Sequence, residues 1–97
     1  MLDARGIIGG NIDMWTVITG NAVKRRLAKI PNSDKERIKQ AILKLQYKRE
    51  ELDIKPLTGS DEYRLRVGGW RLIMRINEEE KLIFIRALGS RGDVYKK

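Results

Sequence analysis

The dipeptide Gly68–Gly69 constrains the fold of this 97-residue chain more than any other feature. It separates residues 63–67 from residues 70–77, two segments in which apolar and basic side chains alternate. A two-residue turn that contains glycine joins antiparallel strands and sets their register. The sequence therefore predicts a β-hairpin in which Val67 lies opposite Trp70.

This register separates the side chains of the hairpin into two chemically different faces, because side chains alternate across a strand. The apolar side chains are predicted to share one face: Tyr63, Leu65, Val67, Trp70, Leu72, Met74 and Ile76. The opposite face is predicted to carry Arg64, Arg66, Arg71 and Arg75, with Arg66 directly across from Arg71.

Four arginines on one face need a physical reason, because like charges directly opposite each other destabilise a sheet. Guanidinium groups match phosphate oxygens in geometry and in charge, so a bound anion would supply that reason. The alternative interpretation is a solvated face whose arginines form ion pairs with Glu78, Glu79 and Glu80.

The residues before the hairpin predict a strand and two helices. Residues 15–18 are rich in β-forming side chains and predict a first strand. Residues 23–30 carry apolar side chains at helical spacing and predict a short basic helix that Pro31 ends. Ser33 and Glu36 have the spacing of a capping box, which predicts the start of a second helix. The apolar stripe of that helix is predicted to comprise Ile38, Ala41, Ile42 and Leu45.

The remaining segments complete one domain. Residues 49–60 lack periodicity and contain Pro56 and Gly59, so they predict a surface loop. Residues 81–88 predict a further, strongly apolar strand, and the tail is expected to add a short strand around Val94. The order β-α-α-β-β-β predicts an α+β fold with two helices packed on one face of a mainly antiparallel sheet.

The first residues of the chain differ from the rest. Residues 1–13 hold three glycines among isoleucines without a clear period. We expect them to form a disordered N-terminal extension, with the folded domain spanning residues 14–97.

The composition favours a polyanionic partner. Lysine and arginine number 21 against 13 acidic residues, which gives a net charge of +8, and such a charge favours nucleic acid through counterion release. The chain has no cysteine and no histidine, so thiolate zinc sites and the usual general base near neutral pH are excluded. We expect no metal, no cofactor and no membrane partner, and the lack of cysteine fits a cytoplasmic protein.

Three segments carry a resemblance to a known family: residues 55–59 (KPLTG), 63–73 (YRLRVGGWRLI) and 88–95 (LGSRGDVY). With them, residues 15–95 resemble the RelE/ParE superfamily of bacterial and archaeal toxins, and most closely the RelE-type mRNA interferases. The resemblance implies a RelE-like ribonuclease fold. It also implies a toxin that enters the A site of the 70S ribosome, cuts mRNA there without a metal, and is held inactive by a cognate antitoxin.

The resemblance also implies site residues. The family's two basic positions in the first hairpin arm fall on Arg64 and Arg66, where the best-known members carry lysine. The family's arginine after the turn falls on Arg71, its strand-end arginine on Arg91, and its C-terminal tyrosine on Tyr95. Because arginine stays protonated in proteins, Arg64 and Arg66 are poor candidates for proton transfer.

The expected chemistry is attack of a ribose 2′-OH on the adjacent phosphate. Preorganised cations stabilise the charge that develops on the phosphate, and we expect Arg71 to contact it. Arg91 is expected to stabilise the leaving group. Tyr95 either activates the 2′-OH, with a pKa lowered by the arginines, or stacks on a base; the sequence leaves the general acid and base open.

Further basic residues are predicted to contact mRNA and ribosomal RNA: Lys24, Arg25, Arg26, Lys29, Arg75 and Lys96. Two alternative functions stay open. One is a ParE-like inhibitor of DNA gyrase with the same fold, and the other is a nucleic-acid-binding member of the superfamily without catalysis.

Overall fold

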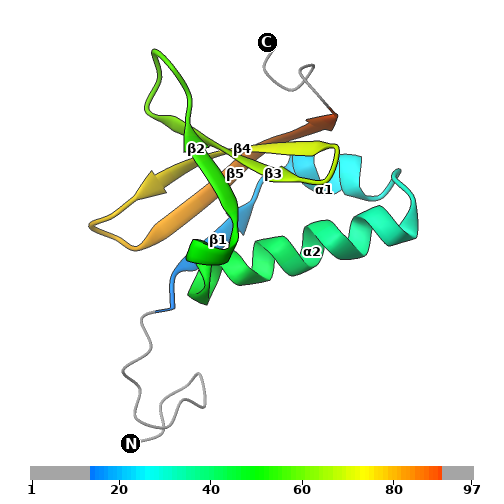
Figure 1. The fold of residues 1–97 in the computed structure, drawn as a ribbon, viewed down its shortest axis with the longest axis horizontal. Coiled ribbons are helices and arrows are strands. Elements are labelled where there is room, and N and C mark those ends of the chain that lie inside the picture. The colour runs from blue at the N-terminus through cyan, green and yellow to red at the C-terminus, as the bar shows by residue number, and fades with distance from the viewer. Residues whose placement is uncertain (1–13, 91–97) are drawn as a thin grey trace, which may run out of the picture.

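The computed structural model of the protein describes residues 14–90. Within them, one five-stranded sheet runs in the order β1-β5-β4-β3-β2 (Figure 1). Its strands are β1 (Thr16–Thr19), β2 (Asp53–Pro56), β3 (Glu62–Val67), β4 (Trp70–Asn77) and β5 (Leu82–Ser90). All neighbouring pairs are antiparallel except β1 and β5, which run parallel. The predicted α+β fold with a mainly antiparallel sheet is confirmed. The expected strand around Val94 and the expected extension over residues 1–13 lie outside the described residues.

Two helices, α1 (Asn21–Leu27) and α2 (Asn32–Tyr47), bury their apolar stripes against one face of the sheet (Figure 1). Three helical side chains are fully buried, Val23 on α1 and Ile38 and Leu45 on α2. They pack with the apolar residues of the hairpin and of β5 in a single core. No helix within the described part of the chain is long and apolar enough to cross a membrane.

The helix boundaries differ from the prediction in two places. Helix α1 ends at Leu27, although Ile30 beyond it is still buried. Helix α2 begins at Asn32, and its N-cap is Pro31, whose extended backbone (φ −59°, ψ 149°) precedes the first turn. Ser33 is therefore already helical and makes no capping hydrogen bond within the described residues, so the predicted capping box is wrong.

The predicted loop over residues 49–60 is wrong in part. Residues Arg49–Glu51 form a single 3-10 turn, and β2 follows and pairs with β3. Strand β2 has four residues and lies at the edge of the sheet, where Pro56 is tolerated because one side of the strand needs no hydrogen bonds. Ile54 is the one aliphatic side chain in this strand before Pro56, so the sequence has no alternating pattern that would predict the strand.

The predicted hairpin register is confirmed, with Val67 opposite Trp70 and Arg66 opposite Arg71. Gly68 has a φ of +59°, a left-handed conformation that favours glycine. Strand β5 adds a feature that the alternation does not show. Met74 pairs with Ile85 and Ile73 pairs with Ala87, which leaves Arg86 as the extra residue of a β-bulge.

Candidate nucleic-acid interface

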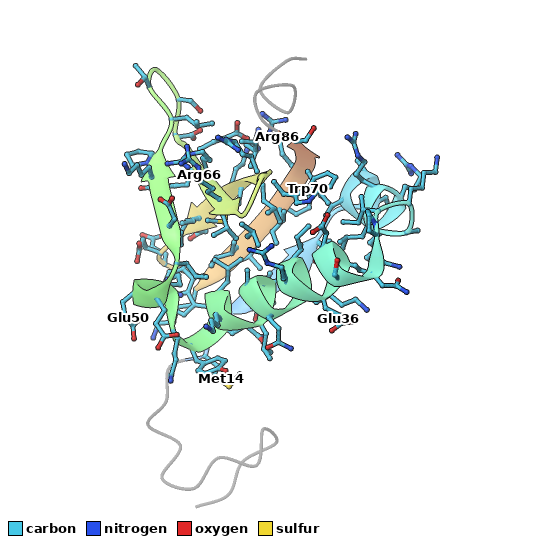
Figure 2. All side chains as sticks on the ribbon, turned by 45° about the vertical axis from the view of Figure 1, so that its right-hand side comes forward. Met14, Glu36, Glu50, Arg66, Trp70 and Arg86 are labelled. Atoms are coloured by element: carbon cyan, nitrogen blue, oxygen red, sulfur yellow. The ribbon has the colours of Figure 1, made fainter. Side chains whose placement is uncertain are left out.

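The face of the sheet opposite the helices gathers arginines from three strands, and we call these residues the arginine face: Arg64, Arg66, Arg71, Arg75 and Arg86. Strand alternation and the register place the first four there, as predicted. The bulge adds Arg86, because it lets both Ile85 and Leu88 reach the core while Arg86 turns to the other side. Figure 2 shows Arg66 and Arg86 on the side of the sheet away from helix α2.

Arg64 is buried at the centre of this face, with 8% of its surface exposed. Its Nη2 atom lies 3.7 Å from Oδ1 of Asp53 on β2, too far for a hydrogen bond. Its Nη1 atom is buried and has no acceptor in the described structure. A buried donor without a partner is costly, and an anion placed at Arg64 would supply the missing acceptor.

Arg66 and Arg71 differ in how far acids neutralise them. The Nε atom of Arg66 lies 4.0 Å from Oδ2 of Asp53, an ion pair at the limit of contact between half-exposed groups. Arg71 is partly buried, and no acid among residues 14–90 pairs with it. Among residues 14–90, Asp53 therefore forms loose ion pairs with Arg64 and Arg66, whereas Arg71 has no acidic partner.

Glu62 clamps the other two arginines. It is 8% exposed, and its Oε2 accepts a 2.6 Å hydrogen bond from Nε of Arg86 and a 3.3 Å bond from Nε of Arg75. Its Oε1 accepts a 2.9 Å bond from Nη2 of Arg86. The hydrogen bonds from Arg86 lower the pKa of Glu62 despite its burial, and those to Glu62 raise the pKa of Arg86.

The alternative in which Glu78, Glu79 and Glu80 neutralise the predicted arginines is wrong for the described structure. The acids that pair with this face are Asp53 and Glu62. The three glutamates lie in the exposed connection after β4, at the far end of the strand from Arg71.

The basic residues of helix α1 and of the turn after it lie beside strand β5. A hollow of about 300 Å³ between them is lined by Ala22, Arg25, Arg26, Lys29, Ala87 and Leu88. The guanidinium of Arg26 lies 5.9 Å from the ring centroid of Trp70, within cation–π range, so Arg26 has a packing role as well. Ala87 pairs with Ile73, which pairs with Arg64, so the hollow is two strands away from Arg64.

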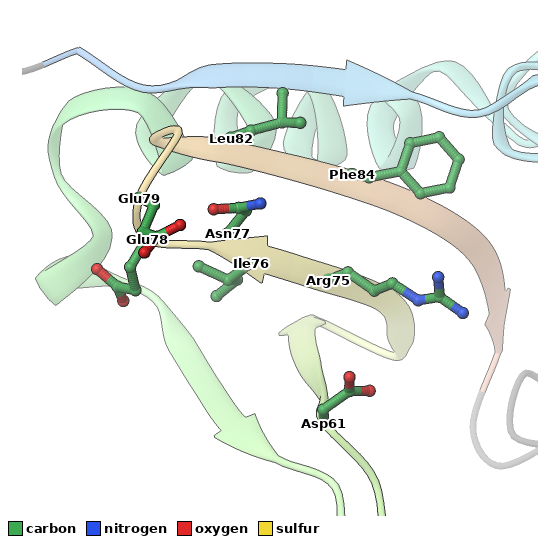
Figure 3. A pocket seen from close by; sticks show the side chains of 8 residues that line it. All are labelled: Asp61, Arg75, Ile76, Asn77, Glu78, Glu79, Leu82 and Phe84. Atoms are coloured by element: carbon green, nitrogen blue, oxygen red, sulfur yellow. The ribbon is translucent and has the colours of Figure 1, made fainter.

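A larger cavity of about 550 Å³ lies across strands β4 and β5, with Asp61 on one side and Phe84 on the other (Figure 3). Glu78 and Glu79 also line it, and the Arg75 side chain extends away from them. Three carboxylates against one arginine repel phosphate, so this cavity is not the anion site. Within residues 14–90, no group of three or more acidic, histidine or cysteine side chains could hold a metal ion.

The sequence profile of the ParE toxin of the type II toxin–antitoxin system parDE matches residues 17–95 of this chain. The chain belongs to this toxin family. RelE1 of Methanocaldococcus jannaschii is 35% identical over 78 residues, which are 76% of this toxin and 87% of that protein.

Solved structures of archaeal relatives share the fold of this toxin. The RelE–RelB complex from Pyrococcus horikoshii OT3 aligns with a TM-score of 0.72 and 30% identity, over 82% of this chain and 98% of that one. The RelB–RelE antitoxin–toxin complex from Methanococcus jannaschii aligns with a TM-score of 0.67 and 25% identity, over 81% and 95%. The predicted membership in the RelE/ParE superfamily is confirmed.

Three predicted site residues of the toxin, Arg91, Tyr95 and Lys96, lie outside the described residues. Strand β5 ends at Ser90, and Gly89 lies directly opposite Arg71.

Sequence reasoning missed Asp53, Glu62 and Arg86 as members of the site. The spacing of Glu62 and Arg64 on one strand face was the available signal for Glu62, whereas the bulge that exposes Arg86 leaves no such signal.

Proposed function

We propose that this toxin is a ribosome-dependent endoribonuclease that cuts mRNA in the ribosomal A site without a metal and so inhibits translation. The observation that carries the proposal is Arg64, a buried guanidinium whose Nη1 atom has no acceptor among residues 14–90. It lies beside Arg66 on the same strand face, and Arg71 lies opposite Arg66 without an acidic partner in the described residues. Such a cluster is suited to a phosphate that gains charge during reaction.

In the proposed reaction the ribose 2′-oxygen loses its proton and forms a bond to the adjacent phosphorus. The bond from phosphorus to the 5′-oxygen breaks, and that oxygen takes up a proton. Arg71 and Arg64 stabilise the phosphate in the transition state, when its charge is largest. Arg91 assists the departing oxygen, and Tyr95 activates the 2′-OH or stacks on a base, as the resemblance implies. Arg64 and Arg66 hold charge and transfer no proton.

Two kinds of partner complete the proposal. Lys24, Arg25, Arg26 and Lys29 contact ribosomal RNA beside the hollow at α1, while Arg75 and Lys96 extend the contact with RNA. A cognate antitoxin with an acidic or amphipathic segment covers the arginine face in the resting state. The support for the antitoxin is that the two archaeal structures are complexes of RelE with RelB. Ribosomes as the target place the toxin in the cytoplasm.

Primer extension on ribosome-bound message tests the proposal. Expression of the toxin should halt translation and leave cuts within codons, with weak cutting of free RNA. The Arg71→Ala protein, expressed at the same level, is the matched control and should leave the message intact. Intact message together with trapped gyrase–DNA breaks would contradict the ribonuclease and favour gyrase inhibition.

A further inference from the structure

Of the cluster of Glu62, Arg75 and Arg86, the function proposed above uses only Arg75, as a further contact with RNA, and gives Glu62 and Arg86 no role. The Glu62 carboxylate is buried, yet it belongs to the face that would bind RNA. Arg86 reaches it because of the bulge in β5, and bulges commonly re-aim a side chain at a functional site.

The way the two arginines bind Glu62 leaves most of their donors pointing elsewhere. Arg86 uses Nε and Nη2 on the carboxylate, and Arg75 uses Nε alone. A guanidinium has five N–H donors. The Nη1 group of Arg86 and both Nη groups of Arg75 make no hydrogen bond to Glu62 and can donate to a ligand. Their side chains are 33% and 67% exposed, while the carboxylate that holds them is covered.

The position of the cluster relative to Arg64 matches the path of a polynucleotide. Glu62 and Arg64 are two residues apart on one strand face, roughly 6.6 Å at about 3.3 Å per residue. A stacked nucleic-acid strand rises about 3.4 Å per phosphate along its axis, and consecutive phosphates lie farther apart than this because the backbone also winds around the axis. The two places are therefore spaced to suit neighbouring phosphates of one strand. Arg75 is directly opposite Glu62, and Arg86 follows the residue that pairs with Met74.

We propose that Arg75 and Arg86, clamped by Glu62, form a second phosphate subsite, which binds a phosphate flanking the one at Arg64. Glu62 is a positioning residue: it touches no RNA and holds the two guanidinium groups in place. The identity of the ligand as RNA rests on the proposed function. The subsite itself is a statement about phosphate binding and is testable without cleavage.

Removal of the Glu62 charge separates this proposal from simple electrostatics. The substitution Glu62→Gln raises the net charge of the protein by one, so a carboxylate that only repels RNA predicts tighter binding in the variant. A carboxylate that positions two arginines predicts weaker binding despite the added charge. The two predictions have opposite signs.

The measurement is fluorescence anisotropy of a labelled single-stranded oligonucleotide with 2′-deoxyribose, which the toxin cannot cut by 2′-OH attack, titrated at several salt concentrations. Glu62→Gln should weaken binding at least threefold and reduce the slope of log K against log salt by about 0.7, the value of one lost phosphate contact on a single strand. Asp61→Asn is the matched control, since Asp61 is exposed beside Arg75 and the charge change is identical. It should leave the slope unchanged and leave binding equal or tighter.

A second variant keeps the test decisive if Glu62→Gln fails to fold. Arg86→Lys preserves the charge but cannot bind the carboxylate through two parallel hydrogen bonds, so it should also weaken binding at least threefold. Unchanged or tighter binding in whichever folded variant is measured overturns the subsite. If Glu62→Gln and Arg86→Lys both weaken oligonucleotide binding but the parent toxin leaves ribosome-bound message intact, the subsite stands and only the ribonuclease proposal fails.

Discussion

Oδ1 of Asp53 lies 3.7 Å from Nη2 of Arg64, so the edge strand β2 places an acidic side chain next to a buried arginine. The same carboxylate reaches Arg66 through its other oxygen. Asp53 therefore competes with any phosphate for two cations of the arginine face.

Asp53→Asn is expected to bind single-stranded RNA about two- to fivefold more tightly at low salt, because the competing charge is gone. Asp53 is half exposed, so the free energy of unfolding should fall by about 1 kcal/mol or less. Anisotropy titrations and urea unfolding measure the two effects. Glu50→Gln, an exposed acid on the 3-10 turn, is the control and should bind RNA almost as the parent protein does. Weaker binding by Asp53→Asn would show that Asp53 orients the arginines instead of competing for them.

Arg71→Ala is expected to lose about 100- to 1,000-fold in cleavage rate while its affinity for the ribosome falls only modestly. The reason is that a preorganised cation contributes most when charge develops on the phosphate. Single-turnover rates at saturating ribosome complex measure the chemical step alone. Cleavage at the parent rate would mean that the arginine face only docks the toxin.

Tyr95→Phe separates the two roles open to the phenol. If the hydroxyl activates the 2′-OH, the single-turnover rate should fall about 100-fold or more. If the ring stacks on a base, Phe should keep most of the activity while Tyr95→Ala loses it. The ribosome affinity of each variant, measured alongside, shows how much of any loss is binding.

Substitutions on helix α1 and in the turn that follows it are expected to weaken binding without slowing the bond-breaking step. The double variant Arg25→Ala, Lys29→Ala removes two cations that line the hollow beside β5, and the salt dependence of ribosome binding should become shallower. Lys39→Ala, an exposed position on α2, is the control and should change neither quantity. A slower single-turnover rate at saturation in the double variant would place these residues in the reaction itself.

The stability of the toxin should depend on pH through Glu62. Hydrogen bonds from Arg86 lower the pKa of this carboxyl in the folded protein, so the folded state binds protons less readily than the unfolded chain does. The resulting stabilisation is complete above about pH 4.3, the ordinary pKa of a glutamate, and is lost as the pH falls through the lower folded-state pKa.

Urea unfolding between pH 7 and pH 2 measures this dependence, and Glu62→Gln should flatten it. Glu51→Gln is a useful comparison, because the pKa of Glu51 is also lowered, by Lys44 and Lys48, but at the protein surface. A parent protein and a Glu62→Gln variant with the same pH dependence would contradict the clamp.

The hairpin and the helix pair could be predicted from the sequence because their causes are local. Two glycines define a turn, a turn defines the register, and alternation then assigns Leu65 and Leu72 to the core and Arg64 to the opposite face. The apolar stripe of α2 follows in the same way from helical periodicity, with Ile38 and Leu45 fully buried.

The capping box and the edge strand show where local signals end. Ser33 and Glu36 have the right spacing, but Pro31 already occupies the N-cap, and this offset of two residues places Ser33 inside the helix. Strand β2 forms because its backbone can hydrogen-bond to the free side of β3. The four residues of β2 have no clear preference of their own for a strand.

The sequence by itself determined which residues could form a cationic face, since the two-residue period of a strand separates arginines from core residues without reference to the rest of the chain. Only the tertiary structure decided how those arginines are held. The bulge that turns Arg86 toward Glu62 and the strand that brings Asp53 to Arg64 both depend on contacts that the hairpin turn does not set. Burial and ion pairing are properties of such contacts, so no local pattern encodes them.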